Sequence, residues 1–293
     1  MSAYRAKPPK GCLLQKGDPL AFGLVVAYLL NEKAGVTGAW KFYDAVSPDT
    51  VTYTRNNADT LWKSGDHGSA FNFGANGSGT PWTYPARKLS QIGSGLTTSS
   101  VSVVGRYAKN GANPNLEITP INNGSSLYST RRAAGDTAGF ILYSTAAAFR
   151  FIADGSGLAV GAKYDLAPTA NQYYTLGGTY ARNTGTATYG GTWTVYLDGI
   201  AVGSNNYNIA GSFAGTFTDN IPTPFTYDTS TAPTSDKRVE FLYVYNRCLT
   251  AREMADIHAD PFRMFRRRNV GLLKASGAAA AAKTPWHLFR QTA

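Results

Sequence analysis

Short runs of strand-forming residues, separated by turns rich in Gly, Pro and Asn, recur along most of this sequence. Runs such as 51–54, 70–73, 101–107 and 173–180 alternate with turn clusters such as 74–79. Closely spaced turns between β-branched and aromatic runs are typical of antiparallel sheets, whereas parallel sheets need long helical crossovers. The pattern therefore predicts an all-β protein and argues against a βαβ architecture.

The composition agrees with a folded β protein. Of 293 residues, 43% are apolar and only 16% are charged, which is enough apolar surface for a large core and excludes disorder of the whole chain. Glutamate is scarce, with four residues, and Thr, Ser, Tyr and Asn are abundant. These residue types favour strands and turns over helices.

The segment 192–203 carries the strongest local signal. Asp198-Gly199 supplies the positive φ angles that a two-residue hairpin turn requires, and apolar residues alternate on both sides of it. A β-hairpin is predicted, in which the following residues face the core: Trp193, Val195, Leu197, Ile200 and Val202.

A second β run, 238–245, leads into the one convincing helix. Alternation predicts that four of its residues share a face, namely Val239, Phe241, Tyr243 and Tyr245. Thr250 is then the expected N-cap, with Glu253 completing a capping box, and Pro261 ends the helix. The pattern predicts a hydrophobic staple between Leu249 and Met254, with Met254 and Ile257 facing the sheets.

The apolar stretch Leu20 to Leu30 is too short for a membrane span and is interrupted by Gly23. No Ala-x-Ala-like cleavage site follows it, so we interpret it as buried rather than as a signal peptide, with residues 24–30 as a central strand of the sandwich. No membrane partner is expected. Cys12 and Cys248 lie too far apart in sequence for a zinc motif. Two reduced thiols are predicted, with a single long-range disulfide as the alternative.

The formal charge of +10 belongs to the two ends of the chain. Residues 1–20 carry a net charge of +3 and residues 263–293 a net charge of +7, which leaves residues 21–262 neutral. A neutral body argues against a nucleic-acid partner. We predict an N-terminal basic arm (1–20), a β-sandwich body (21–262) and a C-terminal basic-aromatic arm (263–293).

Several motifs resemble one family of sandwiches. They are Gly68-x-Ala70-x-x-Phe73, Gly178-Thr179-Tyr180, the Trp193 to Gly203 hairpin and Tyr245-Asn-Arg-x-Leu-Thr-x-x-Glu253. Together they are similar to concanavalin A-like, laminin-G-type lectin and glucanase sandwiches, and the strand-plus-helix ending resembles the variant found in tailed-bacteriophage virion proteins. The resemblance implies a two-sheet antiparallel jelly-roll sandwich with one short C-terminal helix and extended basic terminal arms.

The family resemblance implies three functions: hydrolysis, carbohydrate binding and structural attachment. Retaining glucanases of this fold place two Glu on one strand face, whereas no two glutamates here are closer than Glu240 and Glu253. We therefore expect no enzyme activity and no catalytic residues, with an Asp pair from separate loops as the hydrolase alternative. The three histidines lack metal-ligand spacing, so no metal site is predicted; Ca²⁺ held by oxygen ligands remains an alternative.

Carbohydrate binding would use exposed aromatic platforms. The candidates are Trp82 and Tyr84 in a Gly-Pro-rich loop, Tyr207 among asparagines, and the pair Tyr173 and Tyr174. Most tyrosines of a β-sandwich serve instead as half-buried strand residues. Asp198 is better explained by its hairpin turn than as a calcium ligand.

Basic residues interleaved with apolar ones mark the arms as docking segments, because a free tail gains nothing from displaying apolar side chains. The residues expected to contact a partner are Tyr4, Arg5, Lys7, Lys10, Phe262, Phe265, Arg266, Arg267, Arg268, Trp286, Phe289 and Arg290. The favoured hypothesis is a non-enzymatic bacteriophage virion protein, assembled in the host cytoplasm, present in multiple copies and anchored to capsid or tail proteins. The alternative is a lectin-like module that binds host surface polysaccharide.

Overall fold

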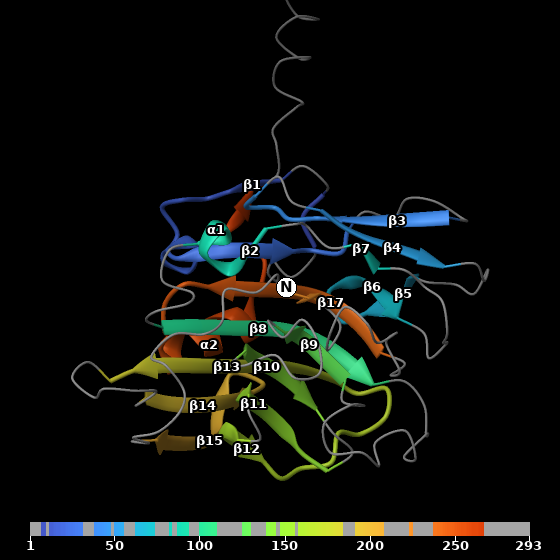
Figure 1. Ribbon diagram of the computed structural model, residues 1–293. Helices are drawn as coiled ribbons and strands as arrows, with labels where there is room; N and C mark the ends of the chain where they lie inside the picture. Colours follow the sequence, from blue (N-terminus) through green and yellow to red (C-terminus); the bar gives the residue numbers. More distant parts are fainter. Residues whose placement is uncertain are drawn as a thin grey trace, which may run out of the picture.

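A computed structural model shows a β-sandwich backed by one helix (Figure 1). The structure describes residues 7–9, 12–31, 38–47, 50–55, 62–73, 82–83, 87–93, 100–109, 125–129, 139–144, 147–155, 158–183, 191–207, 223–224 and 237–266. All pairings between the described strands are antiparallel.

The largest sheet has eight described strands. Its main path runs through β15 (Ile200–Tyr207), β14 (Gly191–Leu197), β13 (Tyr173–Arg182), β8 (Ser100–Lys109), β17 (Lys237–Tyr245), β6 (Gly68–Phe73) and β5 (Trp62–Gly65). The remaining strand, β2 (Leu24–Tyr28), pairs with β17 beside β6. Long central strands such as β8 and β13 provide a rigid support for side chains on both faces.

Smaller sheets complete the architecture. A five-stranded sheet follows the order β12 (Leu158–Tyr164), β11 (Phe149–Gly155), β10 (Gly139–Ser144), β9 (Ser125–Ser129) and β16 (Thr223–Pro224). A three-stranded sheet contains β3 (Gly38–Tyr43), β4 (Thr50–Arg55) and β7 (Trp82–Thr83), and β1 (Leu13–Leu14) pairs with β18 (Phe265–Arg266). The helices are α1 (Leu89–Ile92) and α2 (Ala251–Ala259), with a 3-10 turn at Pro19–Ala21.

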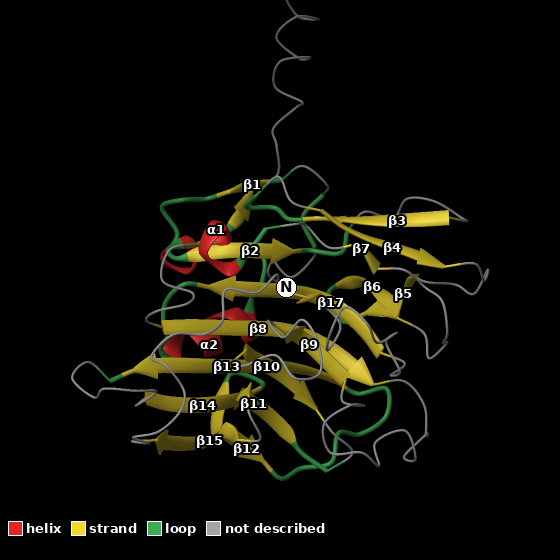
Figure 2. Ribbon diagram, viewed as in Figure 1, coloured by secondary structure: helices red, strands yellow, loops and turns green. Residues whose placement is uncertain are grey.

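Two apolar cores lie on opposite faces of the large sheet. The first core joins this sheet to the five-stranded sheet and includes Trp193, Phe140, Phe149 and Phe151. The second core lies on the other face, under α2 and the terminal segments, as Figure 2 shows for the helix. The predicted all-β antiparallel sandwich with one short C-terminal helix is confirmed.

The predicted hairpin is present as β14 and β15. Asp198 and Gly199 have φ angles of 51° and 82°, which the left-handed region allows for Gly and tolerates for Asp. Trp193, Val195 and Leu197 enter the first core as expected. Ile200 differs from the prediction: it is 68% exposed, because it lies directly after the turn.

The capped helix is also confirmed. The Thr250 side chain accepts a hydrogen bond from the Glu253 N–H, and the Glu253 carboxylate accepts one from the Thr250 N–H at 2.9 Å. Leu249, Met254 and Ile257 are all buried in the second core. Each fully buried apolar side chain of this kind contributes about 1.5–3 kcal/mol, which holds α2 on the sheet.

The prediction for β17 is wrong at one residue. Phe241, Tyr243 and Tyr245 share the second core, but Val239 belongs to the first. The register with β8 shifts between Val239 and Phe241, because a bulge at Glu240 inserts one extra residue. The bulge reverses the alternation and turns the Glu240 carboxylate toward a cluster of polar groups described below.

Two further expectations differ from the structure. The strand at 24–30 was expected to be central, but among the described strands β2 pairs with β17 and otherwise only with Asp44 through an isolated bridge at Tyr28. The boundaries at 20/21 and 262/263 do not coincide with the packed body, because Leu20, Met264 and Phe265 are buried in the second core. Cys12 and Cys248 are both free thiols. No helix of the described part is both long and apolar enough to cross a membrane.

Candidate functional site

Ionisable side chains gather on the outer face of the large sheet, next to the C-terminal end of α2. At the centre is Glu240, with 0% exposure. The His67 N–H donates to Oε1 of Glu240 at 3.2 Å, and Nδ1 of His67 lies 2.8 Å from Oε2. The β5–β6 turn can approach this closely only because residue 65 is Gly: a Cβ there would lie 2.0 Å from Oε1 of Glu240.

Arg106 of β8 connects this buried carboxylate to the surface. Its Nε lies 3.4 Å from Oε2 of Glu240, and its Nη2 pairs with the carboxylate of Asp66. The side chain of Arg106 is 10% exposed, whereas that of Asp66 is 52% exposed. A single guanidinium therefore neutralises one buried carboxylate and fixes the position of an exposed one.

The same guanidinium reaches α2 through Thr175 of β13. Nη1 of Arg106 donates to the Thr175 hydroxyl at 2.8 Å, and Nδ1 of His258 lies 3.0 Å from that hydroxyl. Burial lowers the pKa of His258, and the neighbouring Arg106 and His67 lower it further, against the raising effect of Asp198. A neutral His258 accepts the Thr175 hydroxyl proton while the hydroxyl oxygen accepts from Arg106.

Asp198 and Tyr173 form the half-buried rim of this region. Besides shaping the hairpin turn, Asp198 accepts a hydrogen bond from the Thr175 N–H at 2.8 Å. The Tyr173 ring lies 5.8 Å from Cζ of Arg106, and its hydroxyl donates to the Ser64 carbonyl. Burial, together with the Glu240 carboxylate, raises the pKa of Tyr173 to about 12, so this hydroxyl stays protonated. We call this set the polar cluster: Asp66, His67, Arg106, Tyr173, Thr175, Asp198, Glu240 and His258.

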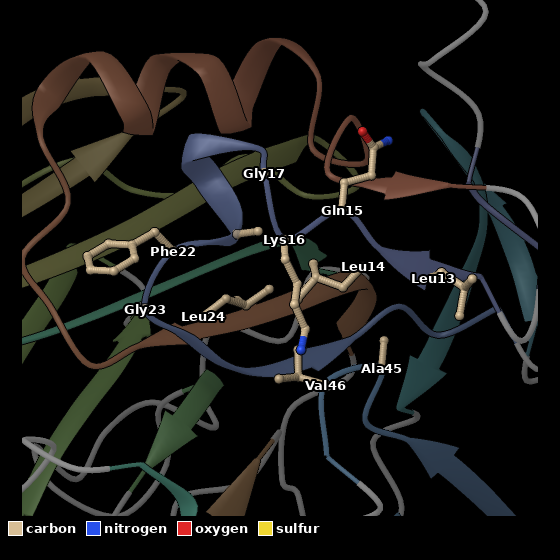
Figure 3. A pocket seen from close by; sticks show the side chains of 11 residues that line it. Leu13, Leu14, Gln15, Lys16, Gly17, Phe22, Gly23, Leu24, Ala45 and Val46 are labelled. Atoms are coloured by element: carbon tan, nitrogen blue, oxygen red, sulfur yellow. The ribbon is translucent and has the colours of Figure 1, made fainter.

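A second feature is a groove of about 880 Å³, which we call the apolar groove (Figure 3). It is lined by residues 13–17, 21–24 and 45–46. Its exposed apolar side chains are Leu13 at 54%, Phe22 at 74% and Val46 at 37% exposure. Lys16 is the one ionisable residue of this lining.

Hydrogen bonds fix the walls of the apolar groove. Residues 13–17 of the lining are tied to the C-terminal segment, because the Gln15 N–H donates to the Met264 carbonyl at 2.8 Å. Residues 45–46 are held by the buried Asp44 carboxylate, which accepts from the N–H groups of Ala27 and Val46. The Arg247 guanidinium lies 5.6 Å from the centre of the Phe22 ring and is itself paired with Glu253.

Three of the predicted arm residues have described side chains, and all three pack on the protein itself. Phe262 and Phe265 are only 2% and 5% exposed and lie in the second core, rather than on a docking arm. The Lys7 ammonium donates to the carbonyls of Leu30 and Ser69. An ammonium is costly to bury without such acceptors, so Lys7 anchors residues 7–9 to the body.

The other arm residues are not described, or are described only in their backbone. Arg266 belongs to β18, but its side chain lies outside the description. The following lie wholly outside the described residues: Tyr4, Arg5, Lys10, Arg267, Arg268, Trp286, Phe289 and Arg290. Attachment through these residues stays a prediction.

The predicted aromatic platform is not gathered in one place. Trp82 lies on β7 of the three-stranded sheet and Tyr207 ends the edge strand β15 of the large sheet, with only their backbones described. Tyr84 lies outside the described residues. Tyr174 is buried in the first core, whereas Tyr173 lies in the polar cluster. Of the two candidates with described side chains, Tyr173 is the one that lies beside charged groups.

Sequence reasoning missed the polar cluster, because its members come from positions 66 to 258 and form no motif. A weaker signal was present: Arg106 and Glu240 are charges inside otherwise apolar strand runs. Among the described residues, no group of three or more His, Cys, Asp or Glu side chains is arranged to hold a metal ion.

Comparison with known proteins identifies the fold. No protein-family model matches the sequence, and no curated protein matches it. The structure is similar to the binding domain of Paraclostridial Mosquitocidal Protein 1, with a TM-score of 0.56 and 13% identity over 83% of this chain and 53% of that chain. It is also similar to the binding domain of botulinum neurotoxin serotype G, with a TM-score of 0.53 and 10% identity over 80% of this chain and 50% of that one.

A third similar structure is a Trypanosoma rangeli sialidase in complex with a difluoro-nononic acid, with a TM-score of 0.50 and 14% identity over 83% of this chain and 33% of that chain. This chain spans about half the length of the two toxin binding domains. At these identities the similarity establishes the β-sandwich fold alone. None of the three is a phage protein, so membership of a virion stays a prediction.

Proposed function

We propose that this protein is a non-catalytic carbohydrate-binding module whose sugar site is the polar cluster. The observation that carries this proposal is that the exposed Asp66 carboxylate and the Tyr173 ring both lie against Arg106, whose guanidinium is buried beside Glu240. A carboxylate accepts hydrogen bonds from sugar hydroxyls, and an aromatic ring packs against the apolar face of a sugar.

Rigidity of the cluster supports binding. Arg106 is fixed by Glu240 and Thr175, and Thr175 is fixed in turn by Asp198 through its backbone N–H. Side chains that are already ordered lose little conformational entropy when a ligand arrives. The fold adds support, because two of the similar structures are named as binding domains.

We expect binding without hydrolysis. A retaining glycosidase needs two carboxyl groups on either side of the glycosidic bond. Glu240 has 0% exposure and both of its oxygens contact His67, so it is not available to a saccharide. Release of reducing ends from a bound glycan would contradict the non-catalytic part of the proposal.

A glycan array probed with the full chain tests sugar binding, followed by calorimetric titration of the best glycan. We expect Tyr173→Ala and Asp66→Asn each to weaken that binding at least tenfold. Asp165→Asn is the matched control, because Asp165 is 65% exposed, pairs with Lys163 and lies outside the cluster. Binding that all three variants preserve would move the sugar site elsewhere, and an array without any bound glycan would overturn the function.

A further inference from the structure

The apolar groove has the properties of an interaction surface that is separate from the polar cluster. Its walls come from the residues before β2 and after β3, and three of its apolar side chains are exposed. Exposed apolar side chains that line one concave surface are typical of protein docking sites. We propose that the groove binds an extended, acidic and apolar peptide segment of a partner protein, which adds as a strand to β1.

The backbone of β1 has one edge that pairs with no described strand. Among the described strands β1 pairs with β18 alone, and the residues of β18 do not line the groove, whereas Leu13, Leu14 and Gln15 do. The Gln15 N–H points toward the β18 side, where it donates to Met264. Because backbone groups alternate along a strand, the N–H and C=O of Leu14 point to the opposite edge. Strand addition needs such an edge.

Side chains of the groove define the peptide. Leu13, Phe22 and Val46 offer apolar contacts for alternate residues of an extended chain. Lys16 is exposed among them, and Figure 3 shows its side chain extending between the lining residues. With one cation and no acid in the lining, the groove favours a peptide that carries a carboxylate close to its apolar residues.

Charge argues against the two other occupants. Residues 267–293 of this chain contain five basic residues and no acidic ones, so they would be repelled by Lys16. A second copy that docks groove to groove about a two-fold axis would bring the two Lys16 side chains together. A partner with acidic residues meets neither penalty.

Selection from a library of random twelve-residue peptides, displayed on phage and panned on the full chain, tests the proposal. We expect the selected peptides to alternate apolar residues and to contain at least one Asp or Glu. A consensus without acidic residues, or no enrichment over panning on the Phe22→Asp variant, would overturn the proposal.

The best selected peptide is then labelled and titrated by fluorescence polarisation. We expect Phe22→Asp and Lys16→Glu each to weaken binding at least tenfold, and Ile200→Asp to leave it unchanged, because Ile200 is exposed outside the groove. Hydrogen exchange at the Leu14 amide should slow when the peptide is bound. Unchanged exchange at this amide would refute strand addition.

Two further measurements test whether the groove instead binds a second copy of the chain or its own C-terminal residues. Dimerisation of the full chain that Phe22→Asp abolishes would assign the groove to a second copy. Peptide binding that tightens tenfold when Trp286 and Phe289 are replaced by Ala would assign it to the C-terminal residues. Either result would overturn the proposal.

Discussion

The polar cluster and the apolar groove both lie outside the interior of the sandwich, yet they are built differently. The cluster consists of polar and ionisable side chains from the large sheet, its turns and the last turn of α2, and its centre is buried. The groove is lined mostly by apolar side chains from residues 13–17, 21–24 and 45–46, and three of them are exposed. The difference predicts that the cluster contributes strongly to stability, whereas the groove does not.

The largest effect is expected from Glu240→Ala. This substitution leaves the Arg106 guanidinium buried without its internal carboxylate. Removing one partner of a buried ion pair costs about 3–5 kcal/mol. Urea unfolding should show this as a lower midpoint, and a loss under about 1 kcal/mol would mean that the cluster does not stabilise the fold.

Replacing Gly by Ala should lower the free energy of unfolding in the polar cluster and raise it in the apolar groove. At Gly65 the new methyl group collides with the Glu240 carboxylate and displaces it from His67, so we expect a cost of about 1–3 kcal/mol. At Gly17 of the groove a Cβ meets nothing within 4 Å, so we expect a gain of about 0.4–1 kcal/mol. Thermal unfolding of both variants measures the difference, and equal shifts would contradict the comparison.

Acidification should lower the free energy of unfolding through His258, by less than the Glu240 and Gly65 substitutions do. Because the folded state lowers the pKa of His258, the unfolded chain binds its proton more readily. Stability contributed by this group is therefore present above its ordinary pKa of 6.5 and is lost as the pH falls through that value. His258→Gln should flatten the dependence of unfolding free energy on pH between 7.5 and 5. An unchanged slope would show that His258 does not titrate differently on folding.

The smallest effect on stability is expected from Phe22→Ala in the groove. Its ring is 74% exposed, and exposed substitutions change stability by no more than about 0.5 kcal/mol. Chemical unfolding should give nearly the same midpoint as the unchanged protein. A loss above about 1 kcal/mol would show that Phe22 belongs to the fold rather than to a binding surface.

Local patterns were sufficient for several elements. The Asp198-Gly199 turn and the Thr250 capping box each depend on a few neighbouring residues, and both are present as predicted. The predicted face of Val239 was wrong because a bulge depends on how the strand pairs with its neighbour, and the sequence of β17 alone does not show that pairing. Terminal residues were misjudged for a related reason: Phe262 and Phe265 bury their rings against a sheet that is assembled from distant segments.

The sequence by itself determined the preference for strands and turns, the hairpin and the capped helix, because these depend on backbone preferences and on contacts within a few residues. Only the tertiary structure decided that Asp66, Arg106 and Glu240 meet, and that residues near 15, 22 and 45 enclose one groove. Electrostatic and apolar contacts act through space, and strand order sets which distant positions become neighbours.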